Sequence, residues 1–129
     1  MQMFDVVLWG LTAFWAEEAA HIMEYEVSGD SCFHDHFHAI GGGGPTAYAI
    51  YRTLGGRRLS ELEESKALLV ILRILVTCID VEVSGVSEPL SAWIVSQGKA
   101  RKVSEEEINE QLQFISEWQE KERRVLFDN

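Results

Sequence analysis

The first 51 residues of the chain lack lysine and arginine altogether. Seven acidic residues lie in the same segment, so it carries a formal charge of −7 within a chain whose net charge is −10. A field of this sign repels the phosphates of nucleic acids and attracts cations and basic proteins. The charge distribution therefore argues against nucleic acid as a partner and favours a basic protein.

Cysteine and long hydrophobic runs are also scarce. Two cysteines, Cys32 and Cys78, are too few for a disulfide framework, which indicates a reducing compartment. The apolar stretch 67–83 contains Arg73 and ends in alternating charges, so it is too short to cross about 30 Å of hydrocarbon. Residues 1–16 are apolar but carry no basic segment and end at Glu17, unlike a signal peptide. We therefore expect a cytoplasmic protein with no membrane partner.

Motifs of catalysis are missing as well. The chain has no Gly-x-Ser-x-Gly elbow and no His-Glu-x-x-His zinc motif. The four glycines 41–44 lack the Gly-Lys-Ser/Thr of a phosphate-binding loop and follow no predicted strand. We therefore predict that the protein is not an enzyme and uses no cofactor.

The chain does have a long apolar centre. Arg73 is the one charge in residues 67–79, and apolar side chains fall on every side of a helical wheel. A helix that is apolar all round lies at the centre of a domain. Ser60-Glu-Leu-Glu63 has the pattern of a capping box, and Ser84-Gly85 is a stop signal. These features predict a buried central helix from about 61 to 81, with Arg73 paired to a carboxylate of a neighbouring helix.

Periodic apolar residues predict helices on both sides of this centre. Phe4, Val7, Leu11 and Trp15 recur at helical steps. The predicted helices cover about 3–26, a short piece from about 31, 46–54, 87–98, and a last helix that starts at the capping box 104–107. The predicted fold is therefore all-α, one domain spanning 1–129, in which five to six helices pack around the central helix.

Histidine is concentrated in one segment, which raises the possibility of a metal site. Cys32, His34, His36 and His38 would share one face of a strand, whereas on a helix only His34 and His38 would. On the predicted first helix, Glu18-x-x-His21 has the three-residue spacing found in di-metal bundles. The alternative function is therefore a metal-binding helical protein, or a metal-dependent enzyme. Its predicted ligands are Glu18, His21, His34 and His38.

Aromatic residues lie among the acidic ones, which is typical of a surface that binds a protein. Acidic charge speeds the encounter with a basic partner, and embedded aromatic side chains anchor the complex. The predicted contact surface consists of Glu17, Glu18, Glu24, Tyr25, Glu26, Asp30, Phe33 and Asp35.

In its small size, acidity and predicted helicity, the chain resembles immunity proteins of bacterial toxin–immunity systems, including those of contact-dependent growth inhibition. The resemblance implies a cytoplasmic protein that binds a cationic toxin domain, most plausibly a nuclease. Such a protein would block the toxin's active site by imitating the charge of phosphate groups. The resemblance carries over no individual residue, because no motif supports it.

Overall fold

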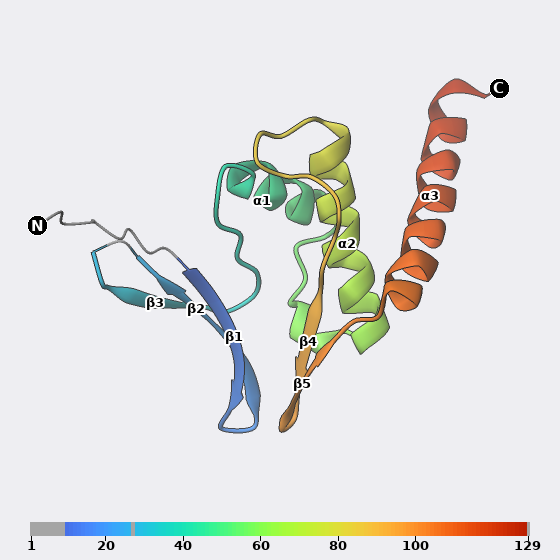
Figure 1. The fold of residues 1–129 in the computed structure, drawn as a ribbon. Coiled ribbons are helices and arrows are strands. Elements are labelled where there is room, and N and C mark those ends of the chain that lie inside the picture. Colours follow the sequence, from blue (N-terminus) through green and yellow to red (C-terminus); the bar gives the residue numbers. More distant parts are fainter. Residues whose placement is uncertain (1–9, 27, 129) are drawn as a thin grey trace, which may run out of the picture.

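The computed structural model describes residues 10–26 and 28–128. These residues form three α-helices and two antiparallel sheets (Figure 1), with 45% of the chain in helix and 21% in strand. The fold is therefore mixed α/β, and the all-α bundle predicted from the sequence is wrong. None of the described helices is long and apolar enough to span a membrane.

The first sheet replaces the helix predicted over 3–26. Strands β1 (Gly10–Ala16), β2 (Ala19–Tyr25) and β3 (Ser31–His34) pair antiparallel in the order β1-β2-β3. Glu17 and Glu18 form the two-residue turn between β1 and β2, with left-handed φ angles of 52° and 61°. Such turns favour asparagine and glycine. Because two glutamates occupy this turn, the sequence carries no signal of the hairpin. Residues 3–9 of the predicted helix lie outside the described residues.

The helices form the other side of the molecule. Helix α2 (Glu64–Asp80) lies between α1 (Gly44–Thr53) and α3 (Glu105–Phe127), and a short 3₁₀ helix (Leu59–Glu61) precedes it (Figure 1). One core cluster joins α1 to α2, and a second joins α2 to α3 and to the residue that follows β5 (Lys99–Lys102). The first consists of Phe37, Ala47, Tyr51, Ile74 and Cys78, and the second of Leu68, Leu72, Val103, Ile108 and Ile115.

The two predicted capping boxes have different outcomes. Before α2, Ser60 belongs to the 3₁₀ helix, and Glu63 occupies the N-cap position without a side-chain cap bond. Before α3, the Ser104 hydroxyl accepts a hydrogen bond from the Glu107 backbone amide at 3.2 Å. The Ser104 cap is therefore confirmed, and the Ser60 cap is wrong.

A second hairpin replaces the helix predicted over 87–98. Strand β4 (Trp93–Ser96) pairs with β5 (Lys99–Lys102) through a tight turn in which Gly98 has a φ of 68°. Glycine adopts this left-handed angle without steric cost, so Gly98 reverses the chain within the hairpin. The hairpin connects α2 to α3, and the Val103 amide that follows it donates to the carbonyl of Ala92 at 2.9 Å.

Arg73 pairs with a carboxylate of the last helix, in agreement with the pairing to a neighbouring helix expected from the sequence. Its Nη2 donates to Glu122 Oε2 at 2.7 Å, and its guanidinium carbon lies 4.8 Å from the centre of the Trp118 ring. Arg73 therefore stabilises the α2–α3 contact and does not orient the acidic segment.

The three-stranded sheet contributes little apolar surface to the core. Among residues 11–26 and 28–34, only Glu24 is buried, with 8% of its surface exposed. Neither core cluster contains a fully buried residue from this sheet. A carboxylate is therefore the most buried group that the sheet directs toward the helices.

Candidate metal centre

Glu24 is the centre of a group of side chains on the inner face of the sheet. In the antiparallel register Glu24 lies directly opposite Cys32, and His34 lies opposite Ile22, so all four share one face. The chain then turns at 35–36 and brings His38 back toward the same carboxylate. Strands β2 and β3 thus supply three polar side chains, and the loop before α1 supplies a fourth.

The donor atoms of these four side chains converge. Glu24 Oε1 lies 3.0 Å from His34 Nε2 and 2.8 Å from His38 Nε2. Cys32 Sγ lies 3.4 Å from His34 Nε2 and 3.9 Å from Glu24 Oε1. The His34 and His38 rings are stacked, with centroids 3.4 Å apart and an angle of 8° between their planes. Two imidazoles and a thiol therefore lie close to one carboxylate.

Tyr48 on α1 contacts the His38 ring at the nitrogen that is not beside Glu24. The Tyr48 hydroxyl donates to the carbonyl of Phe37 at 3.3 Å, and it also contacts His38 Nδ1. In the tautomer that carries its proton on Nδ1, His38 donates to the Tyr48 oxygen, and its Nε2 has a free lone pair. Desolvation by burial, and then the Glu24 carboxylate, raise the pKa of Tyr48, so the hydroxyl keeps its proton.

The Nε2 atom of His38 is buried and lacks a hydrogen bond to any group in the described part of the chain. The 2.8 Å approach to Glu24 Oε1 meets the distance for an ion pair but not the alignment that a hydrogen bond needs. A neutral Nε2 and a carboxylate oxygen are both acceptors. A cation beside the His38 ring would give this nitrogen a partner.

The spacing of the donor atoms suits a small tetrahedral ion. With zinc–nitrogen and zinc–oxygen bonds of about 2.0–2.1 Å and zinc–sulfur bonds of about 2.3 Å, neighbouring ligand atoms lie roughly 3.3–3.6 Å apart. The four measured separations range from 2.8 to 3.9 Å. The separations among Glu24, Cys32 and His34 are thus close to those of a zinc site, and His38 Nε2 lies beside the same carboxylate. Glu24, Cys32 and His34 each offer a ligand atom, and these atoms lie within 4.8 Å of one another.

Electrostatics keep the Cys32 side chain a thiol. Desolvation raises its pKa, and the nearby carboxylates of Glu24 and Glu26 raise it further. Cys78, the other free cysteine, is buried against α1, and desolvation raises its pKa too. Cys32 is exposed, so it is the accessible thiol of the pair.

The structure brings together only half of the predicted metal ligands. His34 and His38 are in the group, but Glu18 is exposed in the β1–β2 turn. His21 lies on the opposite face of the sheet, where its ring stacks on Phe14 at 5.3 Å and its Nε2 bonds the carbonyl of Ala16. The Glu18-x-x-His21 spacing does not bring the two side chains together in a hairpin, because residues three apart along a strand point to opposite faces.

Glu24 was predicted for a different role, and Cys32 was named only for the strand alternative. The alternation of side chains along strands could have indicated both residues. Cys32 and His34 are two residues apart and share one face of a strand, and Glu24 lies on the strand paired with it. His36 does not belong to the group of candidate ligands, because its Nδ1 accepts a hydrogen bond from Arg58 Nε at 2.9 Å.

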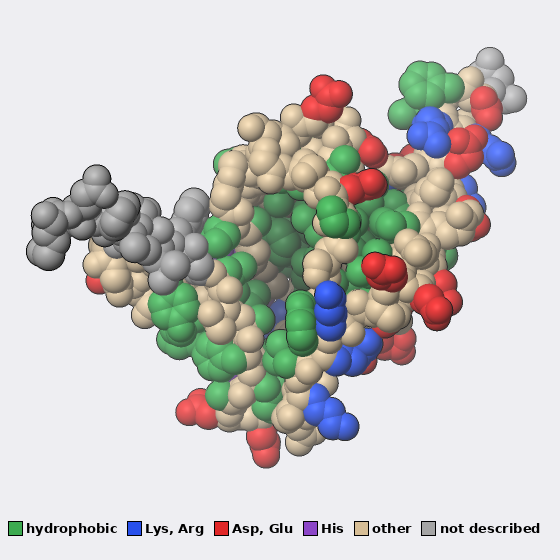
Figure 2. All heavy atoms as spheres, in the orientation of Figure 1, with side chains coloured by type: hydrophobic (Ala, Val, Ile, Leu, Met, Phe, Trp, Pro, Cys, Tyr) green, Lys and Arg blue, Asp and Glu red, His purple; other side chains and the backbone are tan. Residues whose placement is uncertain are grey.

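The predicted protein-binding residues are distributed over the sheet and its turns. Tyr25 and Phe33 lie on the outer face, 39% and 64% exposed, and the Phe33 ring contacts Phe14 and His21. Acidic side chains lie at the tip of the β1–β2 hairpin (Figure 2). The exposed acidic members of the predicted surface are Glu17, Glu18, Glu26, Asp30 and Asp35. Glu24 does not belong to this surface, because it is buried on the inner face.

Comparisons of this chain with known protein families, with curated proteins and with solved structures find no match.

Proposed function

We propose that the protein binds one transition-metal ion, with zinc as the expected occupant, through Glu24, Cys32, His34 and His38. The observation that carries the proposal is the convergence of the donor atoms of Glu24, Cys32 and His34, together with the buried Nε2 of His38 at 2.8 Å from the Glu24 carboxylate. Imidazole, thiolate and carboxylate together are a ligand set typical of zinc. The ion would join the sheet to the loop before α1. Tyr48 would fix the ring of His38 from behind, as groups around zinc-bound histidines commonly do.

The first experiment measures bound metal in protein purified without a histidine tag. We expect about one equivalent of zinc after reconstitution and dialysis, since four protein ligands give a site that survives dialysis. A content below about a tenth of an equivalent would refute the proposal. In that case the group is a hydrogen-bonded pair of histidines around a carboxylate.

Matched variants locate the ion. His34→Ala and His38→Ala should lose zinc, whereas His21→Ala on the outer face of the sheet should keep it, although each variant removes one imidazole. Tyr48→Phe should weaken zinc binding by roughly 10- to 100-fold, the usual cost of losing a group that orients a ligand. Equal loss in His21→Ala would place the metal elsewhere.

Substitution by Co²⁺ tests the ligand types directly. Thiolate coordination produces an intense charge-transfer band in the near ultraviolet, and Cys32→Ser should remove it while d–d bands persist. Zinc should also protect Cys32 from iodoacetamide in the native protein, where Cys78 is buried. Unchanged alkylation of Cys32 at saturating zinc would exclude the thiol as a ligand.

The outer face of the same sheet supports a second candidate function, binding of a basic protein. Exposed Phe33 and Tyr25 lie among acidic turns in a segment without lysine or arginine. Large apolar side chains surrounded by charge of one sign are typical of protein-binding sites. In this role the protein would be a cytoplasmic immunity protein that neutralises a cationic toxin domain, with a nuclease the first choice.

The two candidate functions use opposite faces of the sheet, so variants separate them. Glu17→Lys and Glu18→Lys combined with Asp30→Lys should weaken a complex with a basic partner by roughly tenfold or more and flatten its salt dependence. The same variant should keep its zinc. A complex that persists unchanged would exclude the outer acidic surface as the binding site.

A further inference from the structure

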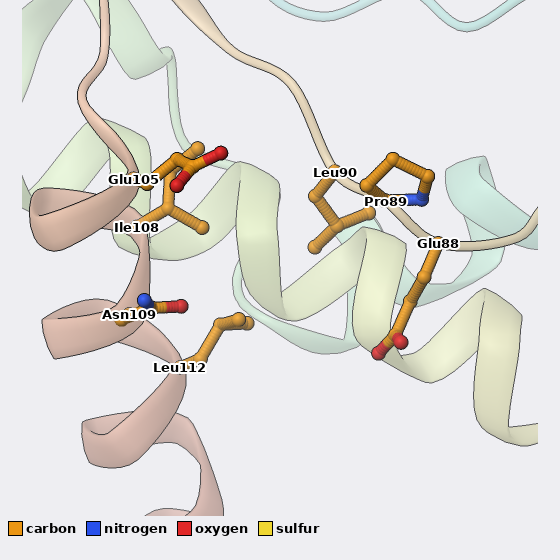
Figure 3. Close-up of a pocket in the computed structure, with 7 residues that line it drawn as sticks. All are labelled: Glu88, Pro89, Leu90, Glu105, Ile108, Asn109 and Leu112. Carbon is orange, nitrogen blue, oxygen red and sulfur yellow. The ribbon is translucent and has the colours of Figure 1, made fainter.

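A groove lies between the first half of α3 and the loop that precedes β4. Its volume is about 340 Å³, and Figure 3 shows Ile108 and Leu112 of α3 facing Leu90 and Pro89 across it, with the carboxylates of Glu88 and Glu105 beside them. A cavity of about 150 Å³ suffices for a benzene-sized ring. The groove can therefore accept an apolar side chain as large as phenylalanine, next to two acidic groups.

The opposite end of α3 is apolar and uncovered. Val125, Leu126 and Phe127 are 82%, 75% and 78% exposed, and the last turns of the helix stand clear of the rest of the chain (Figure 1). Hydrophobic side chains are also visible at this end in the space-filling view (Figure 2). Three consecutive exposed apolar residues are unusual on the surface of a monomer and mark an interaction site.

This end of α3 cannot reach the groove of its own chain. Ile108 and Leu126 belong to one continuous helix, Glu105–Phe127. Their separation of 18 residues corresponds to about 27 Å along the axis at a rise of 1.5 Å per residue. Whatever occupies the groove must therefore come from another segment or another molecule.

We propose that the groove receives the Val125–Phe127 segment of a second copy of the chain, in a two-fold dimer with antiparallel α3 helices. Charge favours this occupant, because Arg123 and Arg124 precede the apolar residues and the groove carries Glu88 and Glu105. The existing pairs of the two arginines with Glu120, at 3.0 and 3.4 Å, are exposed and therefore weak enough to exchange.

A two-fold arrangement uses both features of each chain. In an antiparallel pair, each copy supplies one groove and one Val125–Phe127 segment. Both grooves and both segments are then occupied, so the assembly stops at a dimer.

The test is the mass of the full chain in solution, measured by sedimentation velocity at protein concentrations between about 1 and 100 µM. The wild type should change from the 14.6 kDa monomer to a species of twice that mass. Leu126→Asp combined with Phe127→Asp should remain monomeric. Val81→Asp is the matched control, because Val81 is 58% exposed at the far end of α2 and should leave the mass unchanged.

Reversing the charges on both sides tests whether the Val125–Phe127 end of one copy lies in the groove of the other. Glu105→Arg and Arg124→Glu should each raise the dimer dissociation constant about tenfold or more, and the double variant should regain dimerisation. Circular dichroism confirms that each variant is folded. A wild type that stays monomeric throughout, or a dimer that survives the Leu126→Asp and Phe127→Asp changes, would overturn the proposal.

Discussion

The three-stranded sheet and the α2–α3 pair differ in what lies at their centres. Helices α2 and α3 bury aliphatic residues such as Leu72 and Ile115, with 0% and 1% of their surfaces exposed. The sheet, over its described residues, buries only Glu24, whose carboxylate lies among two histidines and a cysteine. One region is held by the hydrophobic effect, and the other faces the helices through polar side chains.

This difference predicts how the two regions would respond to the proposed ion. Apolar packing needs no partner from solution, whereas the proposed ion would be bound by side chains of the sheet. We therefore expect the helical region to fold with or without metal. The position of the sheet should depend on the site at Glu24.

The largest expected effect is a cavity in the helical region. Leu72→Ala should lower the free energy of unfolding by about 2–5 kcal/mol, because the side chain is fully buried between α2 and α3. Urea denaturation measures the change. Val81→Ala, at an exposed position, serves as the control and should cost less than about 0.5 kcal/mol.

Zinc should stabilise the sheet. At a free zinc concentration of 100 times the dissociation constant, binding adds about 2.7 kcal/mol to the free energy of unfolding. Hydrogen exchange should slow in β2 and β3 far more than in α2, because only the sheet supplies ligands on strands. A chelator or His38→Ala should remove the protection. Uniform slowing across the chain would contradict the contrast between the two regions.

Arg73 is the polar exception within the apolar region. Glu122→Gln should lower stability by about 1–2 kcal/mol, because it leaves the buried guanidinium without its charged partner. Arg73→Met should cost less, since the methionine keeps an apolar contact with Trp118 and removes the buried charge. Thermal unfolding of the two variants gives the comparison, and a larger loss in Arg73→Met would show that the ring contact dominates.

The smallest effect is a pH dependence at the start of α3. Hydrogen bonds from Arg101 lower the pKa of the Glu107 carboxyl from its ordinary value of 4.5. The folded state therefore binds fewer protons there than the unfolded state. Its contribution to stability is present above pH 4.5 and is lost as the pH falls through the lowered pKa. Arg101→Ala should flatten this part of the stability profile, measured by denaturation between pH 6 and the acid limit.

The helical elements were more accessible to sequence analysis than the strands. The apolar run around Leu72 indicated a helix, which the structure places at Glu64–Asp80, and Ser104 marked the start of α3. Both signals are local, because a helix forms its hydrogen bonds within one segment. The hairpins were missed because neighbouring apolar residues, such as Phe14 and Trp15, put hydrophobic side chains on both faces of a strand. The period of two was therefore hidden.

Half of the candidate metal site was predictable, because two of its ligands lie close together in the sequence. His34 and His38 were named because they lie close in the sequence. Glu24 joins them only through the pairing of β2 with β3, which places it opposite Cys32. Sequence spacing does not reveal a pairing between strands whose turn has no strong signal.

The sequence by itself determined the charge asymmetry, the long apolar helix, the capped last helix and the concentration of histidine near residue 36. These properties depend on composition and on residues within a few positions of one another. Only the tertiary structure decided that the acidic segment is a sheet with two different faces. That decision rests on hydrogen bonds between strands, which bury Glu24 beside His34 and His38 and leave Phe33 exposed on the other side.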